Sequence, residues 1–182
     1  ALGVTHDELH SPESPDELRF DEHPGGKPFV SAPPEAKKVQ FNITHTDGMV
    51  ACAVSPEFEV GVDVEDIYRK SATDDIAERF FAAPEVAEYM KIPEKSRFLR
   101  FFQYWTLKEA YIKARGMGLA LPLDRFSYRL DDGPTIGIEF APDLDDEPAA
   151  WQFAQFTPTE RHLVGVAVRR EERPDLSIRV AR

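Results

Sequence analysis

The chain has 182 residues, and its 33 acidic and 22 basic residues give a formal net charge of −11 at pH 7. This balance excludes a general nucleic-acid binder, which normally carries a basic surface. The hydrophobic fraction of 42% and the 13 phenylalanines are enough for a packed core. The single cysteine, Cys52, allows no internal disulfide. Because no apolar stretch reaches membrane-spanning length and no secretory signal is visible, we expect a cytoplasmic protein without membrane contacts.

Glycine and proline divide the first part of the chain into short segments. In order, these predict a strand over residues 17–23, a turn over residues 25–28, a loop from Pro33-Pro34, a strand over residues 41–44, a hairpin turn at Asp47-Gly48 and a strand over residues 49–54. The last of these strands is apolar on both faces, which is typical of a buried strand.

The strand predicted over residues 60–65 alternates almost perfectly. Its three valines point to one face, whereas Gly61, Asp63 and Glu65 point to the other. The strongest helical pattern covers residues 94–115 and ends at a Gly-Met-Gly sequence.

The remaining elements are a helical pattern over residues 72–90, in which Pro84 begins a second helix, and strands over residues 125–130, 135–140, 151–156 and 162–168. Strands and helices are segregated along the chain rather than alternating, which favours the α+β class. We divide the chain into a first lobe, residues 1–58, and a second lobe, residues 59–182.

Two carboxylates share one face of the strand over residues 60–65. Asp63 and Glu65 lie roughly 7 Å apart along the backbone and repel each other unless a cation lies between them. A hard cation such as Mg²⁺ takes a few oxygen ligands from protein and leaves room for substrate phosphates. The alternative is a solvated strand face, since a D-x-E pair alone is a weak signal.

A third carboxylate lies in the long helix. Helical periodicity predicts that Glu109 lies on the most apolar stripe, with Lys108 and Lys113 bordering that stripe on opposite sides. A carboxylate on a core-facing stripe is costly unless it is paired with a charge or a metal. An ion pair from Glu109 to Lys113 would explain the two residues without a functional role, but not why they occupy this stripe.

His45 and Lys27 are candidate ligand-binding residues only when they are considered together with the carboxylates above. His45, between Thr44 and Thr46 at a strand end, can contact an anionic ligand or donate a hydrogen bond to phosphate, and it can equally be an ordinary loop histidine. The rigid Gly26-Lys27-Pro28 turn presents one lysine, which taken alone is a surface side chain.

The ordered motifs are Gly26-Lys27-Pro28, Phe41-Asn42-Ile43-Thr44-His45-Thr46, Gly61-Val62-Asp63-Val64-Glu65 and Trp105-Thr106-Leu107-Lys108-Glu109-Ala110-Tyr111-Ile112-Lys113-Ala114-Arg115-Gly116. This series closely resembles the 4′-phosphopantetheinyl transferases of the larger, surfactin-synthetase-activating (Sfp) type. The resemblance covers nearly all of the chain, including Leu121-Pro122-Leu123-Asp124 and Phe126-Ser127.

The resemblance implies an activity and a ligand set. Family members move the phosphopantetheine arm of coenzyme A onto a serine of an acyl, peptidyl or aryl carrier protein and release adenosine 3′,5′-bisphosphate. By this likeness Asp63, Glu65 and Glu109 bind Mg²⁺ together with the coenzyme A diphosphate. Glu109 is then the candidate base for the carrier serine.

The same resemblance implies how the coenzyme is held. Lys108 and Lys113 would neutralise the diphosphate charge in the transition state. Thr44 and His45 would contact the coenzyme phosphates, and Lys27 with Pro28 would lie near the adenosine end. Positioning and charge stabilisation supply most of the catalysis in such phosphoryl-type transfers.

The family comparison also predicts architecture and leaves rival functions open. Larger members consist of two related lobes with the active site between them, so we expect a pseudo-symmetric monomer. The family's first strand and helix should precede Ala1, so we expect an N-terminally incomplete first lobe. The alternatives are a non-catalytic relative that binds coenzyme A or a carrier protein, and a Mg²⁺-dependent phosphohydrolase that uses the same carboxylates.

Overall fold

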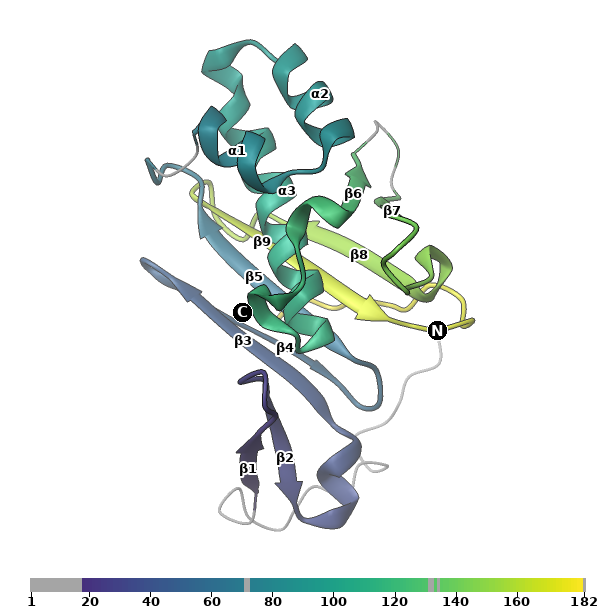
Figure 1. Cartoon of the computed structure of the whole chain (residues 1–182). Coiled ribbons are helices and arrows are strands. Elements are labelled where there is room, and N and C mark those ends of the chain that lie inside the picture. Colours follow the sequence, from purple (N-terminus) through teal and green to yellow (C-terminus); the bar gives the residue numbers. More distant parts are fainter. Residues whose placement is uncertain (1–17, 71–72, 131–132, 134, 182) are drawn as a thin grey trace.

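The computed structural model describes residues 18–70, 73–130, 133 and 135–181, and its architecture is α+β, as predicted (Figure 1). Its strands are β1 (Arg19–Glu22), β2 (Pro28–Ala32), β3 (Gln40–Thr46), β4 (Met49–Ser55), β5 (Val60–Asp66), β6 (Phe126–Arg129), β7 (Gly137–Phe140), β8 (Trp151–Phe156) and β9 (His162–Arg169). Its α-helices are α1 (Asp74–Phe80), α2 (Ala83–Lys91) and α3 (Glu94–Arg115). Among the described helices, none is long and apolar enough to cross a membrane.

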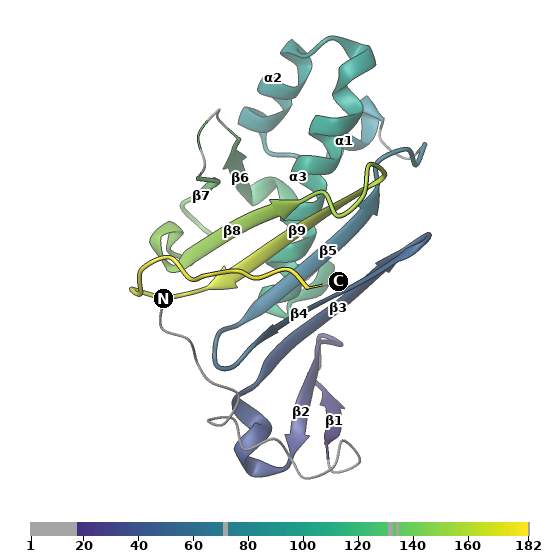
Figure 2. The ribbon, with the colours of Figure 1, turned by 180° about the vertical axis from the view of Figure 1, so that it is seen from behind.

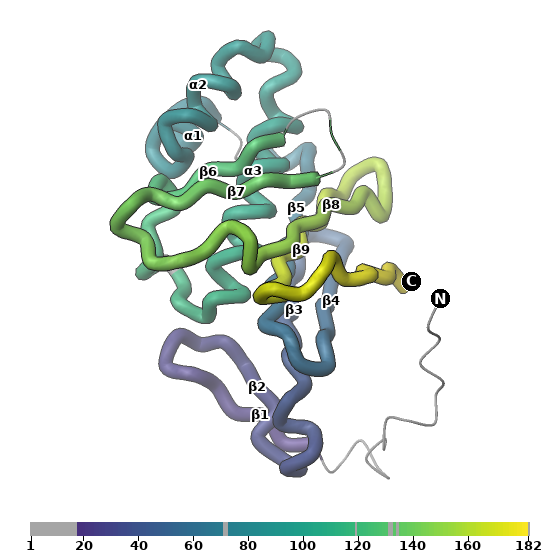
Figure 3. The backbone as a smooth tube through the Cα atoms, turned by 90° about the vertical axis from the view of Figure 1, so that its right-hand side faces the viewer, coloured from purple at the N-terminus to yellow at the C-terminus, as the bar shows by residue number. Residues whose placement is uncertain are grey.

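A three-stranded antiparallel sheet in the order β5-β9-β8 forms the centre of the molecule. Helix α3 packs across β5 and β9, and the antiparallel β3–β4 hairpin runs along β5 (Figures 1 and 2). Helices α1 and α2 lie at the N-terminal end of α3, and the β1–β2 hairpin lies beyond its C-terminal end (Figure 3). The C-terminal half of α3 faces the junction between the β3–β4 hairpin and β5, because Lys113 contacts Thr44 and Asp63 there.

The alternating pattern of β5 gives its two faces different neighbours. Val60, Val62 and Val64 are buried against valines of β9 and against side chains of β4, on the face away from α3. On the opposite face, a Cβ atom at Gly61 would lie 2.0 Å from the carbonyl oxygen of Ala110. Glycine is therefore required for α3 to lie this close to the strand.

A second cluster, rich in aromatic rings, packs around the other side of α3. The ring of Tyr111 contacts those of Phe126, Phe140 and Trp151 at centroid distances of 4.8, 5.6 and 4.8 Å. The helix ends at Gly116, whose φ of 63° is the left-handed conformation typical of a helix C-terminus. The predicted end of the helix is thus confirmed.

Two strand predictions were wrong in part. Strand β2 begins at Pro28, the last residue of the predicted turn, and continues over residues 29–32, for which we predicted no element, because its strand character depends on pairing with β1. Strand β4 was expected to be buried on both faces, but Val50 is 71% and Val54 65% exposed. The face of the β3–β4 hairpin that carries Asn42 and Thr44 packs against β5, whereas on the face of Val50 and Val54 the ring of Phe41 contacts Phe20 of β1 at a centroid distance of 5.4 Å.

Candidate functional site

A charged junction joins three elements near the C-terminal end of α3. The Lys113 ammonium donates to Asp63 Oδ1 at 2.6 Å and to Thr44 Oγ1 at 3.2 Å. The Thr44 hydroxyl in turn donates to Asp63 Oδ1 at 3.3 Å. These contacts tie α3, β5 and β3 together, and they bring residues from both predicted lobes to one point.

The sequence pattern predicts most of this junction but not the pairing. The alternative of a Glu109–Lys113 ion pair does not hold, because the Lys113 ammonium contacts Asp63 across the helix–strand interface instead. Asn42 was not singled out, yet its side-chain oxygen accepts a hydrogen bond from the Val62 backbone N–H at 2.9 Å. Its place on the same strand face as Thr44 is the signal that would have identified it.

One oxygen of the junction has no partner. Asp63 is 5% exposed, and its Oδ2 atom is buried without a hydrogen-bond partner in the structure. A buried carboxylate oxygen without a donor costs free energy, and in native proteins such a group calls for a specific explanation.

The negative charge of Asp63 affects the pKa values of Glu109 and Glu65. Burial, and then repulsion by Asp63 and Glu65, raise the pKa of Glu109 to about 7, although Lys113 opposes the shift. Burial and the Asp63 charge also raise the pKa of Glu65, whereas its partner Arg69, at 3.3 Å, lowers it. The three predicted metal ligands therefore interact electrostatically at one place.

These carboxylates do not form a complete metal cage by themselves. In the part of the chain that the structure describes, no group of three or more His, Cys, Asp or Glu side chains is placed to hold a metal ion. The Asp63 Oδ1 atom is engaged by Lys113, and Glu65 is held by Arg69. Asp63 Oδ2 and the Glu109 carboxylate remain as the oxygen donors without an ion-pair partner among the described residues.

A cavity of about 230 Å³ opens beside the junction. Its lining comes from the Gly26-Lys27-Pro28 turn, from Asn42 and Ile43 on β3, and from Ile112 and Lys113 near the end of α3. The structure thus brings Lys27 and Pro28 to the same cavity as Lys113. The Lys27 ammonium donates to the carbonyl of Ala114 at 2.7 Å, and burial lowers its pKa.

Two predicted coenzyme contacts lie elsewhere. His45 is exposed and points to the face of β3 opposite Thr44, so the structure does not bring it to the junction. Lys108 is fully buried, at 0% exposure. Its ammonium pairs with Glu85 at 2.7 Å and donates to the carbonyls of Leu123 and Phe126 at 2.8 and 2.7 Å.

The prediction that Lys108 binds the coenzyme is therefore corrected. One residue along a helix is a rotation of about 100°, which turns Lys108 into the aromatic core while Glu109 stays at the half-buried side. The stripe predicted through Glu109 is thus a partly exposed side of α3 rather than its most buried face. Glu85, the partner of Lys108, was not predicted, because a glutamate in the first turn of a helix is also a common surface feature.

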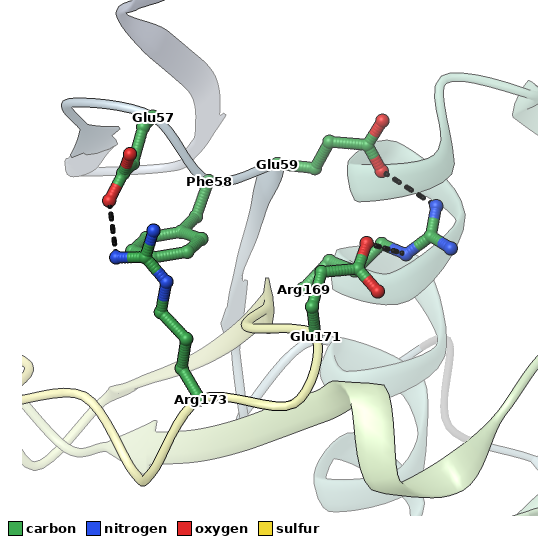
Figure 4. Close-up of a pocket in the computed structure, with 6 residues that line it drawn as sticks. All are labelled: Glu57, Phe58, Glu59, Arg169, Glu171 and Arg173. Atoms are coloured by element: carbon green, nitrogen blue, oxygen red, sulfur yellow. Dashed lines mark hydrogen bonds and ion pairs between the residues drawn. The ribbon is translucent and has the colours of Figure 1, made fainter.

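A larger cavity of about 430 Å³ lies beyond the start of β5, at the opposite end of that strand from Glu65 (Figure 4). Its side chains pair with one another. Arg173 contacts Glu57 at 2.7 Å, and Arg169 contacts Glu171 at 2.9 Å and Glu59 at 3.8 Å. Because the charges of this cavity are already paired, it offers less to an anionic ligand than the junction does.

Comparisons with known proteins place these features in context. The family model described as the 4′-phosphopantetheinyl transferase superfamily matches residues 59–167. The 4′-phosphopantetheinyl transferase HetI of Nostoc is 30% identical over 154 residues, covering 85% of this chain and 62% of the relative. The 4′-phosphopantetheinyl transferase Sfp of Bacillus subtilis is 35% identical over 123 residues, covering 68% of this chain and 52% of the relative. The chain thus spans less than two thirds of the length of these curated relatives.

A solved structure shares the fold. A holo-(acyl-carrier-protein) synthase from Bacillus anthracis, in complex with CoA (3′,5′-ADP), matches with a TM-score of 0.51 at 17% identity. The match covers 61% of this chain and 95% of that one.

Proposed function

The chain belongs to the 4′-phosphopantetheinyl transferase superfamily, and we propose that it transfers the 4′-phosphopantetheine arm of coenzyme A to a serine of an apo carrier protein. The observation that carries this proposal is the buried junction of Asp63, Lys113 and Thr44 with its unpartnered Asp63 Oδ2. A binding module has no need for an unsatisfied carboxylate oxygen beside two further carboxylates.

The donor set of the junction fits Mg²⁺. Mg²⁺ is usually held by one or two carboxylates together with substrate phosphates. Asp63 Oδ2 and Glu109 supply two such oxygens, and Glu65 lies close enough to raise the local negative charge. When bound there, Mg²⁺ would neutralise charge on the coenzyme diphosphate.

The residues of this chain supply the remaining chemistry. The serine oxygen of the carrier forms a bond to the phosphorus that bears the pantetheine arm, and the bond to adenosine 3′,5′-bisphosphate breaks. Glu109, with a pKa of about 7, accepts the serine proton near neutral pH. Lys113, fixed by Asp63 and Thr44, offers its positive charge at the cavity where the diphosphate binds.

The cavity beside the junction suits the rest of the coenzyme. Lys27 and Pro28 border it at one side and Lys113 at the other, and Asn42 and Thr44 of β3 are buried beside β5. We propose that the adenosine end lies by Lys27 and Pro28, and that the chain acts as a monomer in the cytoplasm.

The test is incubation with coenzyme A, Mg²⁺ and an apo carrier protein, followed by intact mass measurement of the carrier. We expect a gain of one phosphopantetheine group, which disappears when Mg²⁺ is chelated. Asp63→Asn should weaken Mg²⁺ binding in calorimetry with coenzyme A present, while Asp124→Asn serves as a control on an exposed aspartate. If folded protein modifies no acyl or peptidyl carrier but binds coenzyme A, the chain is a non-catalytic relative. Phosphate release without a carrier would instead indicate a phosphohydrolase.

A further inference from the structure

A buried aspartate holds the side of α3 that faces away from the candidate site. Asp146 lies in the acidic loop between β7 and β8, yet its side chain is only 2% exposed. Its Oδ2 atom accepts a hydrogen bond from the Tyr111 hydroxyl at 2.6 Å and also pairs with the Arg115 guanidinium. Its Oδ1 atom accepts hydrogen bonds from the Trp151 indole at 3.0 Å and from the Glu147 backbone N–H at 2.9 Å. Both oxygens of this buried carboxylate are therefore satisfied.

These donors favour the ionised form of Asp146. Burial alone would raise the pKa of this carboxyl, but the hydrogen bonds from Tyr111 and Trp151, together with the charge of Arg115, bring the pKa below its usual value. Hydrogen bonds to an ionised acceptor are stronger than those between neutral groups. Asp146 thus forms a strong contact with the last turns of α3.

The two helix residues that Asp146 holds lie on the opposite side of α3 from Lys113. Residues four apart share one side of a helix, whereas residues two apart differ by about 200°. Lys113 is two residues from both Tyr111 and Arg115, so the Asp146 contacts lie behind it, one on either side of its level along the helix axis. The Lys113 ammonium contacts Asp63 at 2.6 Å. Asp146 and the junction therefore hold the same turn of α3 from opposite sides.

A small rotation of this turn would displace the Lys113 ammonium. Side-chain atoms lie about 5–6 Å from the axis of a helix, so a rotation of about 10° moves them by about 1 Å. In an active site, a misplacement of about 1 Å can lower the rate about 100-fold. The contact at Gly61 sets how closely α3 approaches β5, and the hydrogen bonds to Asp146 oppose rotation of the helix about its own axis.

We propose that Asp146 is a positioning residue for the coenzyme diphosphate: by holding Tyr111 and Arg115 it fixes the rotation of the last turns of α3, and thereby the place of the Lys113 ammonium. This proposal deepens the proposed function and rests on its assignment of Lys113 to the diphosphate. None of the residues that line the cavity beside the junction comes from the loop of Asp146. Asp146 therefore acts through the helix and not by contact with the coenzyme.

Asp74 provides a matched control at the other end of α3. It accepts a hydrogen bond from the Tyr89 hydroxyl at 2.9 Å and pairs with Arg97 at 2.7 Å, so it binds the same two donor types as Asp146 Oδ2. Arg97 precedes Lys113 by 16 residues, which is about 24 Å along the helix. Asp74→Asn removes comparable contacts far from the site, and we expect coenzyme A binding to stay within about twofold of the wild type.

The experiment measures coenzyme A binding by calorimetry in the presence of Mg²⁺, which requires neither a carrier nor turnover. Asp146→Asn places an amide NH₂ where one carboxylate oxygen was, so two of the four donors lose their acceptor. We expect this variant to bind coenzyme A about fivefold more weakly and to lose about tenfold in kcat/KM for coenzyme A. Tyr111→Phe removes only one donor and should change both values about two- to threefold in the same direction. Circular dichroism melts establish that each variant is folded.

A double-variant cycle with Lys113→Ala separates positioning from a general structural role. If Asp146 acts through Lys113, Asp146→Asn should weaken coenzyme A binding less than about twofold once Lys113 is alanine. An equal loss in both backgrounds, or none in the wild-type background, would overturn the positioning role. Tyr111→Phe gives the same cycle if Asp146→Asn does not fold.

The same measurements distinguish this proposal from the proposed function. Wild type that binds coenzyme A and shows the coupling between Asp146 and Lys113, but modifies no apo carrier, would overturn the proposed function and leave the positioning role supported. Wild type that modifies a carrier but shows no such coupling would overturn the positioning role alone. Wild type that binds no coenzyme A would overturn both.

Discussion

Asp63 is the residue on which the candidate site depends. Its carboxylate is buried between β5 and α3, and one of its oxygens is held by Lys113 and Thr44. The other oxygen has no hydrogen-bond partner among the described residues, and burial together with the Asp63 charge raises the pKa of both neighbouring glutamates. A single cation would relieve all three effects, which is why the site favours a metal and an anionic substrate together.

Glu109 gives the residue-scale prediction for activity. Its pKa of about 7 means that the free enzyme gains its base as the pH rises to neutrality. We expect kcat/KM, measured at limiting coenzyme A and at a Mg²⁺ concentration too low to occupy the free enzyme, to rise about tenfold per pH unit below this value and to level off above it. Glu109→Gln should lose on the order of 10²- to 10⁴-fold in rate and become insensitive to pH over this range. A flat profile for the wild type between pH 5.5 and 8, or near-normal activity of Glu109→Gln, would contradict the assignment of the base.

At the scale of elements, the contact between β5 and α3 sets the geometry of the site. A Cβ atom at Gly61 would lie 2.0 Å from the Ala110 carbonyl oxygen and 2.4 Å from the Ala114 nitrogen, both of which are backbone atoms that cannot turn away. We expect Gly61→Ala to move α3 away from β5 and to cost about 1–3 kcal/mol of unfolding free energy or more. Denaturant titration measures this cost.

Gly133→Ala is the control for this prediction, because a Cβ atom at Gly133 meets nothing within 4 Å. Its unfolding free energy should stay within about 0.5 kcal/mol of the wild type. Displacement of α3 also separates Lys113 from Asp63, so transfer by Gly61→Ala should fall more than its folded fraction does. Full activity of Gly61→Ala at wild-type stability would show that the helix tolerates this displacement.

The buried Lys108–Glu85 pair acts on the same helix from its other side. Glu85 also accepts hydrogen bonds from the Ala82 and Tyr128 backbone N–H groups at 2.9 and 2.8 Å, so the pair joins α2, α3 and β6. Removing one partner leaves an uncompensated buried charge, and we expect Lys108→Met to lose about 3–5 kcal/mol of unfolding free energy. The double variant Lys108→Met/Glu85→Gln should recover part of this loss, because it removes the stranded charge.

The kinetics of the same variants distinguish a structural from a coenzyme-binding role of Lys108. Below the unfolding temperature of each variant, KM for coenzyme A should stay within about twofold of the wild type, because Lys108 does not reach the cavity. A large rise in this KM with little loss of stability would restore the coenzyme-binding role that the sequence motif suggests.

At the scale of the whole molecule, the sequence predicts the family and most helices and strands. It does not predict which side chains from distant segments contact each other. The superfamily expected from four short motifs is confirmed by the match over residues 59–167. Periodicity identifies the face of β5 that holds Asp63, but the partner of Asp63 is Lys113, 50 residues later. The helical pattern predicts the side of α3 on which Lys108 lies. Only the packing of β6 and α2 against α3 shows that this side faces the core. Contacts between distant segments depend on tertiary packing, which local spacing does not contain.

Global stability offers a readout of the site that does not require catalysis. The pKa of Glu109 rises from 4.5 in the unfolded chain to about 7 in the folded protein. Between these values the folded state binds more protons, so the unfolding free energy falls as the pH rises and the loss is complete above about pH 7. The shift corresponds to at most about 3 kcal/mol, and less in practice because Glu109 is only half-buried and solvent screens its charge.

Comparison with Glu109→Gln isolates this contribution from the other titrating groups. The amide stays neutral, so the variant should match the wild type in unfolding free energy near pH 4.5 and exceed it increasingly up to pH 7. Above pH 7 the difference should remain constant, because both the folded and the unfolded wild type are then ionised at this position. Urea titrations at several pH values measure it. A difference that does not change between pH 4.5 and 8 would mean that Glu109 titrates alike in both states, and that the site does not hold this carboxylate against the repulsion of Asp63 and Glu65.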